Sequence, residues 1–314
     1  MPIQFIKEMN FKEILILFSF VLLFSCQKKR LDELTPNDIA AEAGTTYISI
    51  DESYRPIIQE QADVFMSTYP NATLNLSFKA EDQCWLDLNN KKTELIITTK
   101  KISKEEREKL KNKFGFSFEQ DILAYDAMAI IVNKANKDTL LTKKRVYEML
   151  AGKSDTDKQL VMDGKSATSS LRYVMDSILQ GQPMSKNIKG TQGSQEVIDV
   201  VSKNPKAIGF LGISWIGNPE NSNHLEYLKK VSIVSVENQQ DKTTFVKPTY
   251  SNMIELRYPY RRPITYILKQ NYEGVATGFR NFMRYERGQL IFKRAFLMPI
   301  KMNFYVRPVR VKEK

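Results

Sequence analysis

The sequence has few of the residues on which metal and hydrolytic chemistry commonly depend. In 314 residues it contains two cysteines and a single histidine, His224. Two cysteines exclude a disulfide scaffold and a cysteine-rich zinc protein, and one histidine excludes a site built from several histidines. A histidine-based triad would have to use His224, which lies in a polar stretch where we expect a solvated side chain. We therefore expect no metal, no cofactor and no enzymatic activity.

Glycine and proline are also scarce, with 13 and 12 residues respectively, and charged residues make up 26% of the chain. No repeat with a period of about 20 to 50 residues is visible. These features exclude collagen, a solenoid and a disordered chain. The hydrophobic content of 42% is ample for one large domain or two domains of medium size.

Basic residues exceed acidic ones, with 47 Lys and Arg against 36 Asp and Glu and a formal net charge of +11. This excess suggests an anionic partner, which could be nucleic acid, a membrane surface or a small oxyanion. The lysines and arginines are scattered in small groups, such as residues 143–145, 229–230 and 261–262. Because no nucleic-acid-binding motif accompanies them, we expect no nucleic acid partner.

The N-terminus has the pattern of a secretory signal peptide. Basic residues precede the apolar run Ile14–Phe24, which is too short to cross a bilayer core of about 30 Å but matches the apolar region of a signal peptide. The run leads into a Leu-Phe-Ser-Cys segment that resembles the lipobox of bacterial lipoproteins. We therefore expect residues 1–25 to be a lipoprotein signal peptide, Cys26 to be lipidated after cleavage, and residues 26–44 to be a polar tether. Cys84 then lacks a partner, and we expect it to be a small buried hydrophobe.

From Thr45 onward, strand and helix patterns alternate along the chain. A helical stripe runs from Leu171 to Leu179, and the segment from Ser103 to Glu106 forms a capping box at the start of another helix. We predict strands at 45–50, 73–78, 95–97, 122–132, 207–213 and 231–236, with helices at 54–69, from 103, at 171–179 and at 197–201. The alternation predicts an α/β fold with parallel sheets.

Four predicted strand-to-helix junctions are rich in hydroxyl or amide side chains. They lie at residues 49–53, 98–101, 166–169 and 192–194. In open α/β sheets, ligands bind at the carboxyl ends of the strands, where the free N–H groups of helix starts favour negative charge. The alternative for each junction is that its Ser, Thr or Asp only caps a helix. Four such junctions together indicate an anion site.

Several segments resemble one family in the order in which they occur. Asp163-Gly164-Lys165-Ser166-Ala167-Thr168 resembles the Asp/Glu-Gly-Ser-Gly-Thr segment of the phosphate-binding proteins of phosphate ABC transporters, which are type II periplasmic binding proteins. Further similarity lies at residues 98–106, 124–133, 207–210, 258–259, 279–282 and 286–289. The resemblance extends from about Thr45 to Pro299.

The resemblance implies a two-lobed type II periplasmic-binding-protein fold, with a ligand cleft between lobes that are joined by two strand crossovers. Residues 45–131 and 245–314 would form the first lobe with the C-terminal tail, and residues 132–244 would form the second. An oxyanion would be dehydrated in the cleft. The residues implied to bind it are Ser53, Thr99 and Lys100 from the first lobe and Ser166, Ala167 and Thr168 from the second.

Two features depart from the family pattern. Lys165 is inserted into the Gly-Ser-Gly-Thr motif, and no arginine precedes Asp163, so that Lys165 or Arg172 would supply the positive charge. Lys100 stands where some members have an acidic proton acceptor. A carboxylate acceptor would favour protonated phosphate over sulfate, because it accepts a proton that sulfate lacks. Candidates for it are Asp51, Glu52 and Asp163, each of which could instead be a helix cap or a surface residue.

The function implied is that of a monomeric extracytoplasmic lipoprotein, anchored to the membrane by its lipid and facing the periplasm or the cell exterior. It would bind inorganic phosphate or a similar tetrahedral oxyanion and deliver it to an ABC transporter permease. The alternative is an envelope lipoprotein of the same fold that binds another oxyanion or acts as a sensor or interaction protein.

Overall fold

The computed structural model describes residues 41–90, 92–154, 157–164 and 168–300, and the structural statements below concern these residues. The predicted signal peptide, the lipidation site Cys26 and the site residues Ser166 and Ala167 lie outside them. No helix in the described ranges is long and apolar enough to cross a membrane.

A ten-stranded sheet organises the structure. Eight of its strands follow the order β2-β1-β3-β12-β4-β8-β6-β7, and β9 and β13 also pair with β4. We call β1, β2, β3, β12 and the first part of β4 the first half-sheet, and β6 to β9 with the last part of β4 the second half-sheet. The strands are β1 (Gly44–Asp51), β2 (Ala72–Lys79), β3 (Leu95–Thr98), β4 (Glu119–Asn133), β6 (Gln159–Asp163), β7 (Ile188–Thr191), β8 (Ala207–Gly212), β9 (Val231–Ile233), β12 (Arg261–Leu268) and β13 (Met298–Pro299).

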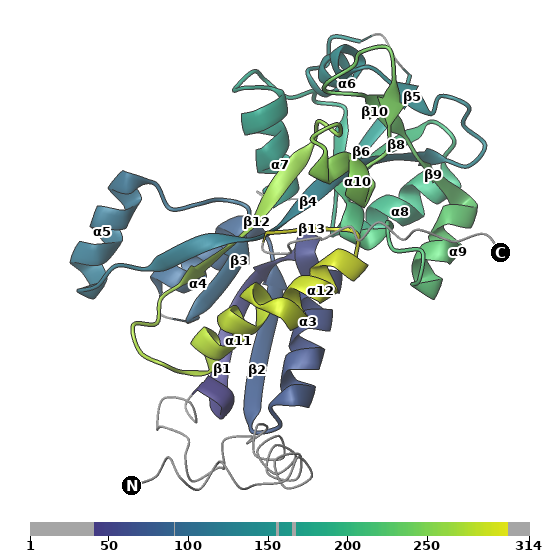
Figure 1. Cartoon of the computed structure of the whole chain (residues 1–314). Coiled ribbons are helices and arrows are strands. Elements are labelled where there is room, and N and C mark those ends of the chain that lie inside the picture. Colours follow the sequence, from purple (N-terminus) through teal and green to yellow (C-terminus); the bar gives the residue numbers. More distant parts are fainter. Residues whose placement is uncertain (1–40, 91, 155–156, 165–167, 301–314) are drawn as a thin grey trace, which may run out of the picture. The chain divides into compact units, whose positions relative to one another are not determined.

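The long strand β4 belongs to both half-sheets. Residues 119–127 of β4 pair antiparallel with β12, whereas residues 128–133 pair antiparallel with β8 and β9. Within each half-sheet the neighbouring strands β1, β2 and β3, and likewise β6, β7 and β8, are parallel. The sheets are thus mixed rather than wholly parallel. In the first half-sheet β12 runs against its neighbours β3 and β4, and in the second half-sheet β4 runs against β8 and β9. Figure 1 shows β4 and β12 running between the two groups of strands. The division into two lobes stays a prediction.

Two helices of the first half-sheet, η3 (Glu52–Tyr54) and α5 (Lys104–Phe114), begin at a residue whose side chain caps them. Asp51 caps the short 3-10 helix η3, and Pro56 lies at the start of α3. The predicted capping box of Ser103 and Glu106 opens α5, which ends at Gly115 in a left-handed conformation (φ 83°). The helices are α3 (Arg55–Thr68), α4 (Glu81–Asn89), α5 (Lys104–Phe114), α11 (Val275–Arg284) and α12 (Glu286–Arg294).

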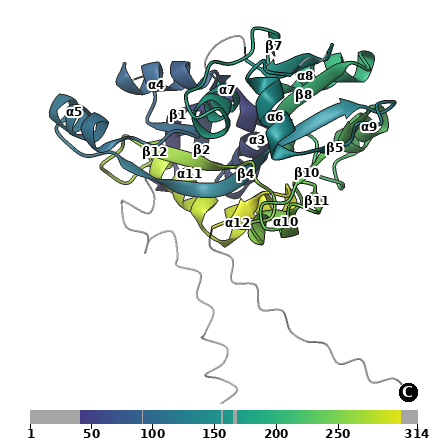
Figure 2. The ribbon, with the colours of Figure 1, turned by 90° about the horizontal axis from the view of Figure 1, so that it is seen from above.

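The second half-sheet has its own helices and a small neighbouring sheet of β5, β10 and β11. Figure 2 shows α4 and α5 at one side of the molecule and α6, α8 and α9 at the other. The elements are β5 (Leu140–Leu141), α6 (Lys143–Leu150), α7 (Ser169–Tyr173), the π-helix η4 (Val174–Ile178), α8 (Ser194–Lys203), the 3-10 helix η5 (Ile213–Trp215), α9 (Ser222–Lys230), β10 (Ser235–Glu237), β11 (Phe245–Val246) and α10 (Tyr250–Ile254).

One predicted strand, at residues 231–236, is wrong as a single element. It is divided at Val234 into β9, which pairs with β4, and β10, which pairs with β5 and β11. The Val234 N–H donates to the Ile130 carbonyl at 2.8 Å, so the chain leaves one sheet and enters another without losing a hydrogen bond at the turn.

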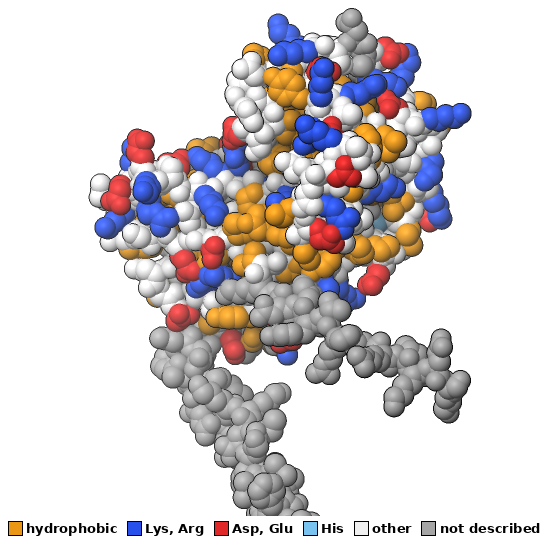
Figure 3. Space-filling model, turned by 45° about the horizontal axis from the view of Figure 1, so that its top comes forward, with side chains coloured by type: hydrophobic (Ala, Val, Ile, Leu, Met, Phe, Trp, Pro, Cys, Tyr) orange, Lys and Arg blue, Asp and Glu red, His pale blue; other side chains and the backbone are white. Residues whose placement is uncertain are grey.

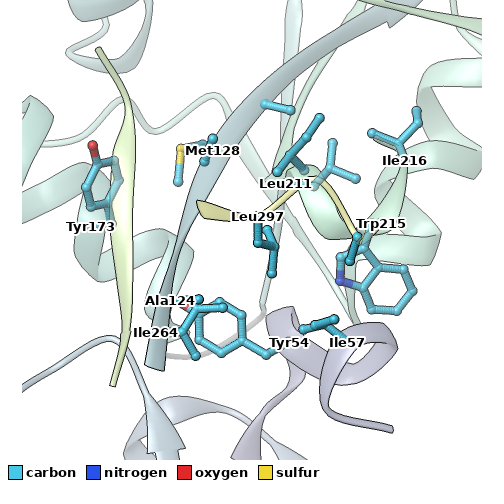
Figure 4. Packing of buried hydrophobic residues seen from close by; sticks show 14 of the residues in the cluster. Tyr54, Ile57, Ala124, Met128, Tyr173, Leu211, Trp215, Ile216, Ile264 and Leu297 are labelled. Atoms are coloured by element: carbon cyan, nitrogen blue, oxygen red, sulfur yellow. The ribbon is translucent and has the colours of Figure 1, made fainter. Parts of the chain in front are cut away.

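The hydrophobic core continues from one half-sheet to the other. Figure 4 shows Tyr54, Ile57 and Ala124 on one side and Leu211, Trp215 and Ile216 on the other, all of them buried. The Trp215 indole N–H donates to the Ser53 carbonyl at 2.9 Å, which ties η5 to η3, the short helix that follows β1. Packing of this kind holds the carboxyl ends of the strands in place.

The predictions for Cys84 and His224 had different outcomes. Cys84 is fully buried with a free thiol, as expected. The prediction that the His224 side chain is solvated is wrong, because this residue lies on α9 and is only 6% exposed. Its Nδ1 accepts the Asn218 N–H at 3.1 Å, and burial lowers its pKa to about 4. His224 is therefore neutral at pH 7 and caps a turn.

Candidate functional site

A cluster of buried polar side chains lies where strands of both half-sheets end. Asp51 ends β1, Asp163 ends β6, and serines at the starts of η3, α7 and α8 surround them. All members are at most 1% exposed, and we call them the buried polar cluster: Asp51, Ser53, Asp163, Ser169, Ser170 and Ser194. Strand order therefore brings chain segments more than 100 residues apart to one place.

Hydrogen bonds within the cluster join the two half-sheets. Ser53 Oγ donates to Asp163 Oδ2 at 2.8 Å, and Ser194 Oγ donates to the same oxygen at 2.9 Å. Ser169 donates twice to Asp51, from Oγ at 2.8 Å and from its backbone N–H at 3.1 Å. The other oxygen of Asp163, Oδ1, is buried and has no partner among the described residues. A buried carboxylate oxygen of this kind can accept one more proton-bearing group.

A buried ion pair lies beside the cluster. Arg262 on β12 donates from Nε to Asp126 Oδ2 on β4 at 2.9 Å and from Nη1 to Ser170 Oγ at 2.7 Å. Burial alone would lower the pKa of Arg262, but Tyr54 and the carboxylates of Asp126 and Asp163 raise it, so the guanidinium is charged. Gly212 makes room for this pair, since a Cβ there would lie 2.7 Å from Arg262 Nη2.

Glu81, the first residue of α4, receives four hydrogen bonds. Its Oε1 accepts from the backbone N–H groups of Thr99 at 2.8 Å and Lys100 at 2.9 Å. Arg172 on α7 donates to the same carboxylate from Nε at 2.5 Å and from Nη2 at 3.0 Å. This bidentate pair is a second link between the half-sheets, because α4 belongs to the first and α7 to the second.

The electrostatic environment of Asp51 is unusual for an aspartate. Its pKa is raised from 3.8 to about 6. Burial is the largest cause, the carboxylates of Glu81 and Asp163 also raise the pKa, and hydrogen bonds from Ser53 and Ser169 oppose the rise. Near neutral pH the cluster thus holds more negative than positive charge. An anion that enters it must bring a proton or find one there.

A pocket of about 850 Å³ opens beside the cluster. Its walls come from the ends of β1, β2, β6 and β7. They include residues of three of the four predicted junctions, at 49–53, 166–169 and 192–194, whereas no residue of the junction at 98–101 lines the pocket. Residues from these four ends include Glu52, Lys79, Ala80, Gly164, Thr168 and Gly193. The basic side chains of this pocket are Arg55 and Lys79. Arg55 pairs with Glu52 and Lys79 pairs with Asp87, and all four residues belong to the first half-sheet.

The predicted site residues that the structure describes lie close to this edge, but their polar groups already have partners. Ser53 donates to Asp163, and the Thr99 hydroxyl is hydrogen-bonded to the Tyr54 hydroxyl. Lys100 Nζ pairs with Glu106 Oε1 at 2.5 Å and lies 4.9 Å from the centre of the Trp85 ring.

Thr168 is the N-cap of α7. Its hydroxyl accepts the Leu171 N–H at 3.3 Å and donates to the Asp163 carbonyl at 2.9 Å. The Thr168 side chain therefore caps a helix, which was the alternative to anion binding for this junction. Thr168 also lies at the wall of the pocket, beside the site. Its part in ligand binding stays a prediction.

Sequence reasoning missed Glu81, Asp126, Ser170 and Arg262. Asp126 interrupts the apolar part of β4, whereas Arg262 follows Arg261 at the start of β12. A charge within a buried strand needs a partner. That signal was readable. Glu81 gave none, because an acidic residue in the first turn of a helix is common. No group of His, Cys, Asp and Glu in the described ranges is arranged to hold a metal ion.

Comparison with known proteins places the chain in a family context. A family model described as a PBP superfamily domain matches residues 35–286. The phosphate-binding protein PstS of Borreliella burgdorferi is 23% identical over 310 residues, covering 92% of this chain and 99% of the relative.

Two solved structures share the fold. One from Clostridium perfringens is described as a phosphate ABC transporter substrate-binding protein with bound phosphate; it has a TM-score of 0.67 and 20% identity, and the match covers 82% of this chain and 100% of that one. An ABC-type phosphate transport receptor from Vibrio cholerae has a TM-score of 0.60 and 17% identity, with the same coverage. The described residues therefore have the mixed α/β fold of type II periplasmic binding proteins.

The raised pKa of Asp51 predicts a pH-dependent stability. Between about pH 4 and pH 6 the folded protein holds a proton that the unfolded chain has released. The contribution of Asp51 to the free energy of unfolding is thus largest below pH 4, decreases as the pH rises through 6, and is constant above. The total decrease is about 3 kcal/mol, at about 1.4 kcal/mol per pKa unit.

The measurement compares the wild type with Asp51→Asn, which cannot titrate. Denaturant titrations measure the free energy of unfolding of both proteins at each pH. Between pH 4 and pH 7 we expect the wild type to lose about 3 kcal/mol relative to the variant. A difference that stays constant over this range would mean that Asp51 titrates as it does in the unfolded chain.

Proposed function

Because the chain belongs to the PBP superfamily, we propose that it is an extracytoplasmic substrate-binding protein that binds phosphate or a similar tetrahedral oxyanion where its two half-sheets meet. The observation that best supports this is Asp163. Its buried Oδ1 lacks a donor among the described residues, while its Oδ2 receives two serine hydroxyls, one from each half-sheet. A protonated oxyanion would supply the missing donor.

The donors for the ligand's other oxygens come from the same edge. Helix and loop starts direct backbone N–H groups toward it, and the proposed ligand residues are Ser53, Thr99, Lys100, Ser166, Ala167 and Thr168. Hydrogen bonds to a charged group contribute about 1.5 to 3 kcal/mol each, so several of them together offset the dehydration of a small anion.

Selectivity would follow from the carboxylates. Asp51 and Asp163 are both buried at the site, and a carboxylate repels an anion unless a proton lies between the two. Hydrogen phosphate and hydrogen arsenate carry such a proton at neutral pH, whereas sulfate does not. We therefore propose phosphate as the physiological ligand and an ABC transporter permease as the partner that receives it.

The distribution of charge supports a small anion over nucleic acid. On the face drawn in Figure 3, lysine and arginine side chains are spread among acidic and neutral ones rather than gathered into one patch. Binding to a nucleic acid backbone needs a continuous basic surface.

Calorimetric titration with phosphate, arsenate, molybdate and sulfate tests the function. We expect binding of phosphate and arsenate and much weaker binding of sulfate. Lys100→Ala should weaken phosphate binding by about two- to five-fold, with an effect that shrinks at high salt, because a part-exposed charge contributes up to about 1 kcal/mol. Lys101→Ala removes the same charge from the next, exposed residue and should leave the affinity unchanged.

If the wild type binds none of the four oxyanions at millimolar concentration, transport is ruled out. The protein would then be a sensor or interaction protein built on the same fold.

We further propose that the protein is held at the membrane by a lipid on Cys26. Cys26→Ser should abolish labelling by a radioactive fatty acid and release the protein into the soluble fraction, because the other cysteine of the chain, Cys84, is buried in the fold. Cys84→Ala is the matched control and should keep both the label and the membrane association. Membrane retention of the Cys26→Ser variant would contradict the anchor.

A further inference from the structure

Glu81 occupies an anion-binding arrangement made by the chain itself. The side chain is 3% exposed, and its carboxylate lies between the turn after β3 and helix α7. Two backbone N–H groups, from Thr99 and Lys100, donate to it, as does the guanidinium of Arg172 in a bidentate pair. Two N–H groups at a turn together with a bidentate arginine form a donor set suited to an oxyanion.

Two of these four hydrogen bonds, those from Arg172, link the two half-sheets. Thr99, Lys100 and Glu81 belong to the first half-sheet, whereas Arg172 belongs to the second. The Ser53–Asp163 and Asp51–Ser169 contacts cross between the half-sheets as well. In each of these contacts the acceptor is a carboxylate of the chain itself, so carboxylates of the chain join the two half-sheets.

The Glu81 carboxylate has space into which it can move. A second pocket, of about 600 Å³, is bordered by Glu81, Lys100 and Arg172 and by the apolar side chains of Trp85 and Met175. A rotation of the Glu81 side chain into this pocket would free the two N–H groups and keep the carboxylate near the Lys100 ammonium, with partial exposure to water.

We propose that Glu81 is an internal competitor for the oxyanion: its carboxylate occupies the N–H groups of Thr99 and Lys100 and holds Arg172 until a ligand displaces it. The part concerning ligand affinity rests on the proposed function, whereas the part concerning closure does not. Because the apparent affinity is reduced by the fraction of protein that is not competent to bind, this residue sets the concentration at which the site fills.

The structure distinguishes Glu81 from an ordinary acidic residue at a helix start. Such a residue interacts with its own helix and lies at the surface. Glu81 instead makes all four of these hydrogen bonds to residues outside α4. In Glu81→Gln, the amide oxygen can still accept the two backbone N–H groups, but the amide NH₂ faces the donors of Arg172, so the bridge to α7 is lost.

The experiment compares the wild type with Glu81→Gln, Arg172→Gln and the control Asp176→Asn. Asp176 pairs with the same arginine at 3.3 Å but lies on η4, next to α7, and is exposed. Circular dichroism checks that each variant is folded. X-ray scattering then measures the radius of gyration without and with phosphate, and calorimetry measures phosphate affinity. Tryptophan fluorescence, recorded in a Trp85→Phe background because the chain has two tryptophans, reports the contact of Trp215 with Ser53.

Without phosphate, we expect Glu81→Gln and Arg172→Gln to be more expanded than the wild type, with altered Trp215 fluorescence, and Asp176→Asn to match the wild type. Glu81→Gln should bind phosphate at least about 10-fold more tightly, since one hydrogen bond to a charged group changes an equilibrium by about 10- to 100-fold. Arg172→Gln should bind more weakly, because it lacks a donor that the ligand needs.

Three outcomes decide the proposal. Expansion of Glu81→Gln with tighter binding supports it fully. If Glu81→Gln is more expanded than the wild type but neither of these two proteins binds any oxyanion, the proposed function is ruled out. The role of Glu81 in keeping the half-sheets together would still be supported. Scattering and affinity equal to those of the wild type, or weaker phosphate binding by Glu81→Gln, would overturn it.

Discussion

Charge buried between the half-sheets is the constraint on which the arrangement of this protein depends. Asp51, Asp126, Asp163 and Glu81 are all removed from water, and an isolated buried carboxylate is costly unless donors surround it. The chain supplies serine hydroxyls, backbone N–H groups at strand ends and two guanidinium groups. Loss of one partner of a buried ion pair costs about 3 to 5 kcal/mol, so the donors and carboxylates must stay matched as a set.

This constraint connects the fold with the proposed function. The donors that satisfy the carboxylates are the groups that an oxyanion needs, and they lie at the edge where parallel strands of both half-sheets end. An entering anion therefore exchanges with a carboxylate of the chain instead of filling an empty cradle. Such an exchange couples ligand binding to the contacts that hold the half-sheets together, and it favours a ligand that brings its own proton.

The sequence predicted the parts of the fold that depend on local patterns. The capping box of Ser103 and Glu106 and the apolar run within residues 122–132 are local signals, and both lie in the expected elements. The strand predicted at 231–236 failed because the change from one sheet to another at Val234 depends on partners distant in sequence. His224 failed for a related reason, since its polar neighbours gave no sign that tertiary packing covers it.

The candidate site was predictable in place but not in detail. Hydroxyl-rich junctions correctly indicated the strand ends, and Ser53 and Thr168 lie there. Which donors are already occupied could not be predicted, because it depends on contacts such as Glu81 with Arg172, 91 residues apart. The family resemblance supplied the oxyanion, and it gave no indication that a carboxylate of this chain competes for the same groups.

A crystal structure grown with arsenate, measured at the arsenic absorption edge, tests the central claim most directly. The account predicts one strong anomalous peak between the half-sheets, within hydrogen-bonding distance of Asp163 and of the Thr99 and Lys100 N–H groups, with the Glu81 carboxylate moved away from them. An arsenate-bound crystal with no peak there, or with Glu81 still accepting the Thr99 and Lys100 N–H groups, would contradict it.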